Sequence, residues 1–318
     1  MTGGTGFIGS ALVKSLLSSN HEVIVFDDNS RGSINKLKGY SDRITIINGD
    51  VRKPEEVARA AEDCDNIFHL AFINGTRFFY EKPDLVLDVG IKGAFSTIES
   101  AKNNKINTYV LASSSEVYQT PKNIPTNETE RAIIPDIINP RYSYAGGKLI
   151  SELLAINLLR DTNVRTLIFR PHNVFGPDMG FEHVIPELMK KLFVNTDGWS
   201  KKECRIKLQG DGNESRSFCY IDDAINQIMV MFNNGENRNI YHIGMDKEIT
   251  INHLVQDIAK ILEIKIKIDT GEKPIGGTSR RCPNIEKIKS IGYNKIDNYH
   301  KGLKKTINWY KNYYANNE

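Results

Sequence analysis

Two rhythms of apolar and polar positions alternate along the first half of the chain. Short apolar runs typical of buried strands lie at residues 22–26, 43–48, 66–70, 108–112 and 165–169. Between these runs, apolar residues recur every three or four positions, which predicts helices over residues 11–17, 54–62, 83–102 and 144–160. Strands that alternate with helices of this length form a parallel sheet with helices on both faces. The pattern therefore predicts a doubly wound α/β domain.

The rhythm becomes less regular after Pro171. The pattern predicts helices over 185–193, 222–232, 252–263 and 299–313, and short strands over 205–208, 240–243 and 264–268. Turn-forming pairs such as Gly210-Asp211 and Asn234-Gly235 interrupt these elements. We therefore expect a first domain over residues 1–170 and a smaller substrate-binding lobe over 171–318. Part of residues 216–245 is expected to return to the first domain.

A glycine-rich turn stands at the start of the first predicted helix. Gly3, Gly6 and Gly9 have the spacing Gly-x-x-Gly-x-x-Gly. Such a turn lets the backbone approach a ligand closely, and the helix that follows offers free N–H groups and a positive dipole end to a phosphate. Asp27 ends the next strand, about 20 residues beyond the glycines, where a dinucleotide fold holds ribose hydroxyls. The stretch predicts dinucleotide binding, with NAD favoured over NADP, although Arg31 lies nearby.

The pattern lacks one strand. A glycine turn of this kind follows a central strand, yet only Met1 and Thr2 precede it here. The runs at 22–26 and 66–70 are apolar enough to be interior strands, so each needs a neighbour between them. We expect a few residues rich in Val, Ile or Leu to precede Met1 in the native protein. The 318-residue form is then expected to be poorly soluble and weak in NAD binding.

Composition excludes several classes of function. Hydrophobic residues make up 40% of the 318 positions and charged residues 25%, which is ordinary for a soluble globular protein. A net charge of +3 without a basic block does not suggest nucleic acid. The cysteines at 64, 204, 219 and 282 lack metal-binding spacing and indicate reduced thiols rather than a disulfide frame or a metal site. No long apolar stretch indicates a membrane span, and we expect a cytoplasmic location.

The most informative chemistry lies in the middle of the chain. Tyr144 and Lys148 are four positions apart on a predicted helix, so both face the same way. A tyrosine has an ordinary pKa of about 10, and a nearby ammonium lowers it. A serine hydroxyl from the strand end Ser113 to Glu116 can bridge to the substrate oxygen. Such a trio removes a proton from an alcohol as hydride leaves its carbon. Tyr142 lacks this arrangement, because Gly146 occupies its fourth position.

On these motifs the chain resembles an extended short-chain dehydrogenase/reductase of the NAD-dependent nucleotide-sugar epimerase/dehydratase family. The likeness covers nearly the whole chain and implies a Rossmann-type sheet. It implies Tyr144 as the base, Lys148 as its partner on the nicotinamide ribose, and Ser114 as the hydroxyl donor. The NAD-binding residues that it implies are Gly3, Gly6, Phe7, Ile8 and Gly9 at the pyrophosphate, Asp27, Asn29 and Ser30 at the adenosine ribose end, Asp50 and Val51 at the adenine, and Leu70 and Ala71 along the dinucleotide.

The resemblance also implies a nucleoside-diphosphate sugar as substrate, and we expect a homodimer. Asn173 matches the family residue that contacts the sugar diphosphate, and Arg216 matches a phosphate-binding arginine. Arg281 is a similar candidate, because a guanidinium binds oxyanions through a fixed fork. His172 is unusual at its position; it either touches the sugar or hydrogen-bonds behind Asn173.

The reaction class is left with alternatives. Family members oxidise sugar C4 to a ketone, and we expect an epimerase, which then returns hydride to the other face. The related 4,6-dehydratases use an adjacent Asp-Glu pair, whereas this chain has Ser115-Glu116, which weakens that alternative. Glu116 still leaves C5 chemistry open, including a decarboxylase resembling UDP-xylose synthase, and a C4-dehydrogenase is a further alternative. Glu116 could instead be a loop carboxylate that caps backbone N–H groups. The non-enzymatic alternative is an NAD(P)-sensing module, which would not need Ser114, Tyr144 and Lys148.

Overall fold

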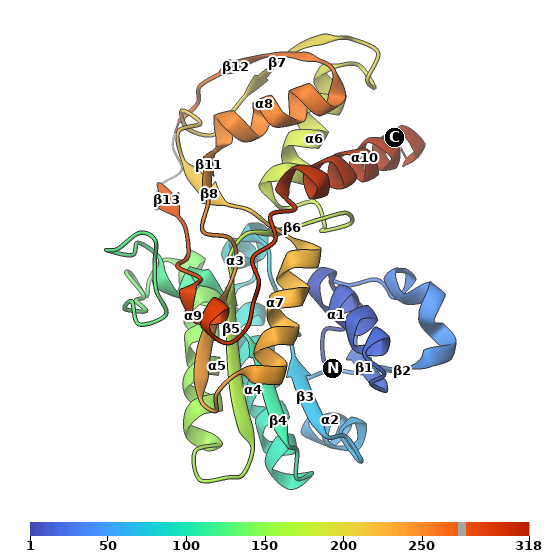
Figure 1. The fold of residues 1–318 in the computed structure, drawn as a ribbon, viewed down its shortest axis with the longest axis vertical. Helices are drawn as coiled ribbons and strands as arrows, with labels where there is room; N and C mark the ends of the chain where they lie inside the picture. Colours follow the sequence, from blue (N-terminus) through green and yellow to red (C-terminus); the bar gives the residue numbers. More distant parts are fainter. Residues whose placement is uncertain (273–277, 318) are drawn as a thin grey trace.

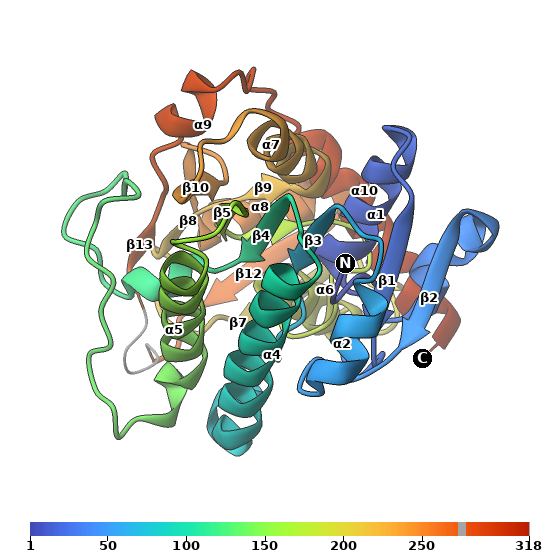
Figure 2. The same cartoon turned by 90° about the horizontal axis from the view of Figure 1, so that it is seen from below.

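A central parallel sheet lies between two layers of helices in the computed structural model, which describes residues 1–272 and 278–317 (Figures 1 and 2). Its strands are β1 (Val23–Asp27), β2 (Ile44–Asn48), β3 (Asn66–His69), β4 (Thr108–Ala112), β5 (Arg165–Pro171) and β10 (Asn239–Ile243). β2 pairs with β1 on one side, and β3, β4, β5 and β10 follow one another on the other, all in parallel. The predicted doubly wound sheet is confirmed.

Met1 and Thr2 lie between β1 and β3, where the pattern predicts a longer strand. Thr2 forms single parallel bridges to Phe26 and to His69. The Thr2 N–H donates to the carbonyl of Phe68 at 2.9 Å, and the Phe26 N–H donates to the carbonyl of Met1 at 2.8 Å. These contacts join the two parts of the sheet and place Gly3 directly at its carboxyl edge. Residues before Met1 stay a prediction.

Helices cover both faces of the sheet. α2 (Pro54–Ala60), α4 (Pro83–Asn103) and α5 (Ser143–Leu158) lie on one face, and α1 (Phe7–Ser18) and α7 (Ile221–Asn234) lie on the other (Figure 2). β4 shows why its sequence reads as one apolar run. Tyr109 and Leu111 pack in the core with α4 and α5, whereas Val110 and Ala112 pack in the core with α1 and α7. A strand buried on both faces needs apolar residues at every position.

The second lobe lies beyond the carboxyl ends of these strands (Figure 1). Its elements are β6 (Val174–Phe175), α6 (Val184–Asn195), β7 (Glu203–Lys207), β8 (Ser215–Ser217), β9 (Cys219–Tyr220), β11 (Glu248–Thr250), α8 (Ile251–Leu262), β12 (Lys265–Asp269), β13 (Arg280–Arg281) and α10 (Tyr299–Asn317). They form small sheets rather than one large sheet. Within residues 216–245, α7 and β10 return to the main sheet, while the domain border at residue 170 stays a prediction.

Several short elements have no clear signal in the sequence. They are η1 (Ile34–Arg43), α3 (Thr76–Glu81), η2 (Ser115–Tyr118), η3 (Pro140–Tyr142) and α9 (Glu286–Ser290), together with β6, β8, β9, β11 and β13. Most are too short to show a hydrophobic period. α3 lies at the predicted site, because its Phe79 ring stacks on Tyr144. Among the helices described, none is long and apolar enough to cross a lipid bilayer.

Candidate active site

The glycine turn forms an open cradle at the start of α1. Gly3 has a φ of +72°, and a Cβ there would lie 2.6 Å from the Ala71 nitrogen. A Cβ on Gly9 would lie 2.1 Å from the Gly3 oxygen, so these two glycines close the turn on itself. A Cβ on Gly6 would meet only the Gly3 oxygen, at 3.2 Å, which leaves the outer side of the turn open. Among the described residues, no side chain caps the first turn of α1, so its N–H groups are available to a phosphate.

A cavity beside this cradle has the composition that an adenosine group needs. Its wall includes most of the predicted residues, namely Gly3, Gly6, Asp27, Ser30, Asp50, Val51, Leu70 and Ala71. Asp27 is oriented by the N–H groups of Thr5 and Asn29, each donating to its carboxylate at 2.9 Å. Phe7, Ile8, Gly9 and Asn29 do not line the cavity; the first three begin α1, and Asn29 lies in the loop after β1. An N–H cradle followed by a carboxylate fits NAD.

The three residues predicted to act on the sugar hydroxyl lie together. Ser114 follows β4, and its hydroxyl lies close enough to the phenol of Tyr144 to lower the pKa of that phenol. Tyr144 is only 8% exposed, stacked on Phe79 with ring centroids 4.8 Å apart. The Lys148 ammonium lies 5.8 Å from the centroid of the Tyr144 ring and donates to the carbonyl of Ala112 at 2.6 Å. The i, i+4 spacing on α5 therefore places both side chains beside the end of β4.

The electrostatics of this cluster correct one expectation. The sequence predicts that Lys148 lowers the pKa of Tyr144; in the structure burial raises that pKa, and the Ser114 hydroxyl acts in the opposite direction. Burial also lowers the pKa of Lys148 to about 7, against the attraction of Glu152. The reason is geometric, since the ammonium is bound to the Ala112 carbonyl rather than to the phenol. Both groups are thus biased toward their neutral forms.

An ion pair stands on the other side of Ser114. The Arg281 guanidinium on β13 donates to the Glu116 carboxylate at 2.7 Å. Burial would raise the pKa of Glu116, but Arg281, Arg141 and Arg216 outweigh it and hold that pKa below its ordinary value. Glu116 is therefore an ionised partner of arginine. The described contacts of its carboxylate do not include the backbone caps that the alternative interpretation predicts.

Asn173, Arg216 and Arg281 line one large pocket, with a volume of about 430 Å³, and their contact with a sugar nucleotide stays a prediction. Asn173 has a φ of +42° and donates from its amide to the carbonyl of Ser217 at 3.1 Å. Arg216 donates to the carbonyls of Ser215 and Thr278, each at 2.8 Å. Burial lowers the pKa of Arg216 to about 10, so it stays a cation at neutral pH. The pocket wall thus contains two guanidinium groups and an amide, which are groups suited to bind an oxyanion.

His172 lies behind the pocket wall rather than on it. The side chain is 1% exposed, and neither ring nitrogen has a hydrogen-bond partner among the described residues. Its ring meets that of His242 with centroids 4.6 Å apart. Burial holds the pKa of His172 well below its ordinary value, so the ring is neutral. The structure therefore does not bring His172 to the substrate pocket, and the hydrogen bond expected behind Asn173 is not formed.

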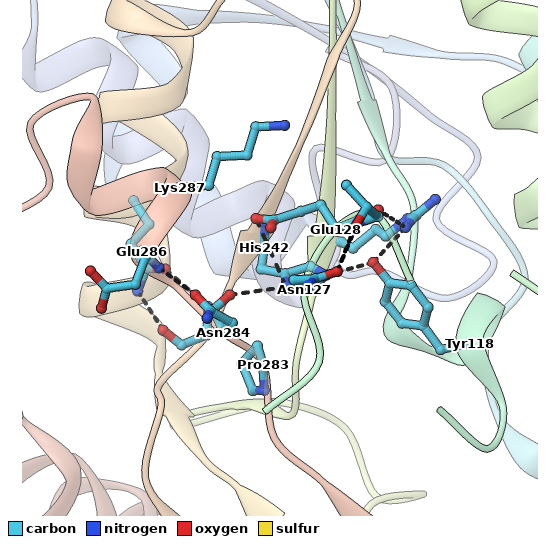
Figure 3. Close-up of polar contacts among 12 residues, drawn as sticks. Tyr118, Asn127, Glu128, His242, Pro283, Asn284, Glu286 and Lys287 are labelled. Carbon is cyan, nitrogen blue, oxygen red and sulfur yellow. Dashed lines mark hydrogen bonds and ion pairs between the residues drawn. The ribbon is translucent and has the colours of Figure 1, made fainter. Parts of the chain in front are cut away.

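A buried polar network behind these residues is not apparent from the sequence motifs. Ser113 and Arg170 both donate to Glu152, one turn beyond Lys148 on α5. Arg170 also donates to the hydroxyl of Tyr118 at 2.5 Å, and that oxygen lies 2.6 Å from Nε2 of His242. Figure 3 shows the continuation from His242 to Asn284. A carboxylate and a guanidinium inside apolar stretches were the available sequence signal, because buried charges are paired.

The same network anchors the segment that carries Arg281. The Glu128 carboxylate accepts from the N–H of His242 at 3.0 Å, as Figure 3 shows. Two residues earlier, the N–H of Thr126 donates to the carbonyl of Cys282 at 2.8 Å. The loop that contains Thr126 and Glu128 therefore holds residues 282–284 against the end of β10. The strand end with Ser114 and the segment with Arg281 are connected through one set of buried contacts.

The comparisons with known proteins agree with this geometry. The model of the NAD-dependent epimerase/dehydratase family matches residues 1–244. The chain belongs to this family. It is 28% identical to a UDP-N-acetyl-alpha-D-glucosaminuronate decarboxylase of Bacillus cytotoxicus, over 98% of this chain and 97% of the relative. It is 27% identical to a putative UDP-glucose 4-epimerase of Methanocaldococcus jannaschii, over 98% of both chains.

One similar solved structure has the same fold and contains NAD. The dTDP-glucose 4,6-dehydratase of Streptomyces venezuelae, with NAD bound, has a TM-score of 0.85 and 25% identity, over 98% of this chain and 96% of the other. The predicted family, the fold class, the enzymatic nature of the chain and the NAD cofactor are confirmed. The relatives comprise epimerases, decarboxylases and dehydratases of nucleotide sugars, so the family alone does not distinguish these reactions.

Proposed function

We propose that this family member is a decarboxylase of a nucleoside-diphosphate uronic acid. The observation that supports the proposal is the Glu116–Arg281 ion pair, 2.7 Å long, two residues along the chain from Ser114. If Ser114 and Tyr144 hold the O4 hydroxyl, the substituent on C5 lies on the neighbouring carbon, toward Ser115 and Glu116. A guanidinium at that position suits a carboxylate, because it binds both oxygens in one plane. The name of the relative from Bacillus cytotoxicus describes it as a decarboxylase of such an acid.

The residues of this chain then handle the protons. Tyr144, in its phenolate form, accepts the proton of the O4 hydroxyl, and Ser114, which lowers the pKa of Tyr144 against the effect of burial, orients that oxygen. NAD, when bound, supplies the acceptor and later the donor of the C4 hydride. The resulting 4-keto uronic acid is a β-keto acid. Its C5–C6 bond breaks, the electron pair passes toward the C4 oxygen as an enolate, and carbon dioxide leaves. C5 then takes a proton from solvent, C4 regains hydride, and Tyr144 returns its proton to O4.

Ser115 fits this reaction better than a dehydration. A dehydratase must protonate the departing C6 hydroxyl, and Ser115 is a poor acid for that step. Carbon dioxide needs no acid to leave, so a serine is sufficient there. Glu116, ionised beside Arg281, is suited to fix the guanidinium in place while the substrate carboxylate binds to its free donors. The low pKa of Glu116 argues against its use as an acid at neutral pH.

Epimerisation at C4, which the sequence favours, is the second candidate. It needs Ser114, Tyr144 and Lys148 together with room for the keto sugar to turn. The relative from Methanocaldococcus jannaschii supports it. The two candidates share the oxidation at C4 and differ only in whether the C5 substituent is a carboxylate that leaves.

Incubation with a panel of nucleotide sugars separates the candidates. The panel contains UDP-, GDP-, dTDP- and CDP-linked hexoses and uronic acids, and the products are followed by mass spectrometry and NMR. Loss of carbon dioxide from a uronic acid supports the decarboxylase. A changed stereocentre at C4 without a change of mass identifies an epimerase, and loss of water identifies a dehydratase. Tyr144→Phe serves as the inactive control for each product.

We also propose that the chain forms a homodimer through α4 and α5. Phe95 on α4 and Leu153 on α5 are 48% and 57% exposed, and Ile150 lies one turn before Leu153. Apolar side chains exposed on adjacent helices suit burial by a second copy. Sedimentation should show a dimer for the wild type and a monomer for Leu153→Glu. A monomeric wild type at micromolar concentration would contradict this proposal.

A further inference from the structure

Arg31 is a cation in a place where a cation changes cofactor choice. It lines the same cavity as Asp27, four residues along the chain. Among the described residues of that wall, Arg31 is the basic one. In dinucleotide folds, a carboxylate at the end of the second strand favours the free ribose of NAD, and an arginine nearby accommodates the 2′-phosphate of NADP. The chain therefore carries both signals at one end of its cofactor site, although its cofactor is NAD.

The structure shows that this guanidinium is already bound. Its Nη2 donates to Oε2 of Glu182 at 3.0 Å. Its face lies over the Phe78 ring of α3, with Cζ 4.5 Å from the ring centroid. Glu182 comes from the turn between β6 and α6, which belongs to the second lobe, and it lines the substrate pocket. A residue of the substrate lobe thus neutralises a cation of the cofactor site.

Backbone geometry keeps Glu182 in this position. Gly75, just before α3, has a φ of +125° and lies against the carboxylate. A Cβ at Gly75 would be 2.1 Å from Oε2 of Glu182 and 3.1 Å from Nη2 of Arg31. Arg77 approaches the other carboxylate oxygen at 3.9 Å and also Glu81 at 3.6 Å. The junction therefore contains two guanidinium groups and two carboxylates, and its charge is balanced.

We propose that Glu182 is a specificity-determining residue for the cofactor: by holding Arg31 it withdraws the guanidinium from the 2′-phosphate of NADP. Asp27 repels that phosphate, and the pairing removes the attraction that would offset the repulsion. The pair is about one-third exposed on each side, so its own contribution to stability is small. Its effect on specificity is larger, because a freed arginine gains charge-assisted bonds to a phosphate. The inference concerns the cofactor and holds whichever sugar reaction the chain performs.

Cofactor affinity tests this inference without any turnover. Glu182→Gln keeps the size of the side chain and removes its charge. Titration with NADP and NAD by calorimetry should show NADP affinity increased roughly fivefold or more, while NAD affinity changes less than about twofold. Adding Arg31→Ala to Glu182→Gln should abolish the gain. Glu187→Gln is the matched control, since this neighbouring carboxylate of α6 has no described contact with Arg31.

Each remaining outcome overturns the inference. An unchanged NADP affinity in Glu182→Gln would mean that Arg31 does not reach the phosphate when released. A gain that survives the loss of Arg31 would assign the effect to the carboxylate alone. An equal loss of affinity for NAD and NADP would mean that the junction closes the cofactor site without selecting between the two cofactors. Retained NAD binding in the variant shows that the fold is intact.

Discussion

The two sides of the site treat buried charge in opposite ways. On the α5 side, burial raises the pKa of Tyr144 and lowers that of Lys148, so neither group has a strong preference for its charged form. On the β13 side, Glu116 and Arg281 are paired, and the carboxylate pKa falls below its ordinary value in spite of burial. Ser114 and Ser115 separate the two sides. A titratable group without a charged partner can exchange a proton. A group in an ion pair keeps its charge and can bind an oppositely charged part of the substrate.

The difference has a structural origin. Tyr144 and Lys148 come from one helix and face an apolar wall of Phe72 and Phe79. Glu116 and Arg281 are 165 positions apart in sequence and meet because β13 pairs with β8 and the segment after it is anchored at Thr126. A local helix pair thus supplies the chemistry, and a long-range contact supplies the binding charge. The predictions below change one side at a time.

The largest effect is expected at Tyr144. Tyr144→Phe keeps the ring stacked on Phe79 and removes the hydroxyl that accepts the proton, so turnover should fall roughly 10²-fold or more. Affinity for NAD should stay close to that of the wild type. The control is Tyr142→Phe, which removes a hydroxyl from a neighbouring tyrosine in η3. Turnover of Tyr144→Phe near the wild-type rate would contradict the assignment of the base.

Arg281 gives the next largest effect. Arg281→Ala leaves Glu116 without its closest partner and removes the donor for the substrate carboxylate, so kcat/KM for a uronic acid should fall roughly 30-fold or more. Arg280→Ala is the control, because the preceding arginine pairs with Glu248 on the exposed side. For a hexose substrate without a carboxylate, kcat/KM should fall less than it does for the uronic acid. An equal loss for both would show that Arg281 does not recognise the carboxylate.

Arg216 should affect binding more than chemistry. Its described donors bond to backbone carbonyls, so the charge is free to meet a diphosphate in the pocket. Arg216→Ala should raise KM roughly tenfold and change kcat little, since a diphosphate contact is made in the ground state and the transition state alike. Steady-state kinetics over a range of substrate concentrations measure both constants. A large loss of kcat with KM unchanged would place Arg216 in the chemistry instead.

The local side of this comparison is the part that the sequence predicts well. The run at 108–112 coincides with β4, and the long helix predicted over 83–102 is observed as Pro83–Asn103. The spacing of Tyr144 and Lys148 is a property of one helix, so their common direction follows without a tertiary structure. The same holds for the glycine turn, whose contacts lie within a few residues and the neighbouring strand end.

Contacts between residues far apart in the sequence cannot be predicted from such patterns. The sequence does not show that the Arg281 guanidinium reaches Glu116, and the assignment of Arg281 to a diphosphate stays a prediction. The direction of the Tyr144 pKa was wrong, since it depends on burial against the aromatic wall that α3 helps to form, and α3 has no periodic signal. Glu152 was detectable: it is a lone carboxylate in the apolar run 149–156, one turn after Lys148. Its partner Arg170 required the fold.

The smallest expected effect is on stability, because burial of the Lys148 ammonium destabilises the folded protein. Its pKa is about 7 in the folded protein and has an ordinary value of 10.5. Between these values the unfolded chain holds a proton that the folded chain lacks, so stability rises with pH from 7 to 10.5. Below pH 7 both states are protonated, and the folded state bears the full cost of burying the ammonium. Lys148→Met removes this group. Any pH dependence of the difference in melting temperature between the variant and the wild type therefore reports on Lys148.

Melting curves of the cofactor-free proteins from pH 6 to pH 9 test this. Lys148→Met should show its most favourable melting temperature relative to the wild type at pH 6 to 7, and the margin should narrow by a few degrees at pH 9. The lost hydrogen bond to Ala112 shifts the margin equally at every pH, so it does not affect the slope. Lys92→Met on α4, whose ammonium is exposed beside Asp88, is the control with a flat margin. A margin for Lys148→Met that is equally flat would mean that burial does not lower the pKa of Lys148, and the contrast between the two sides of the site would then rest on Tyr144 alone.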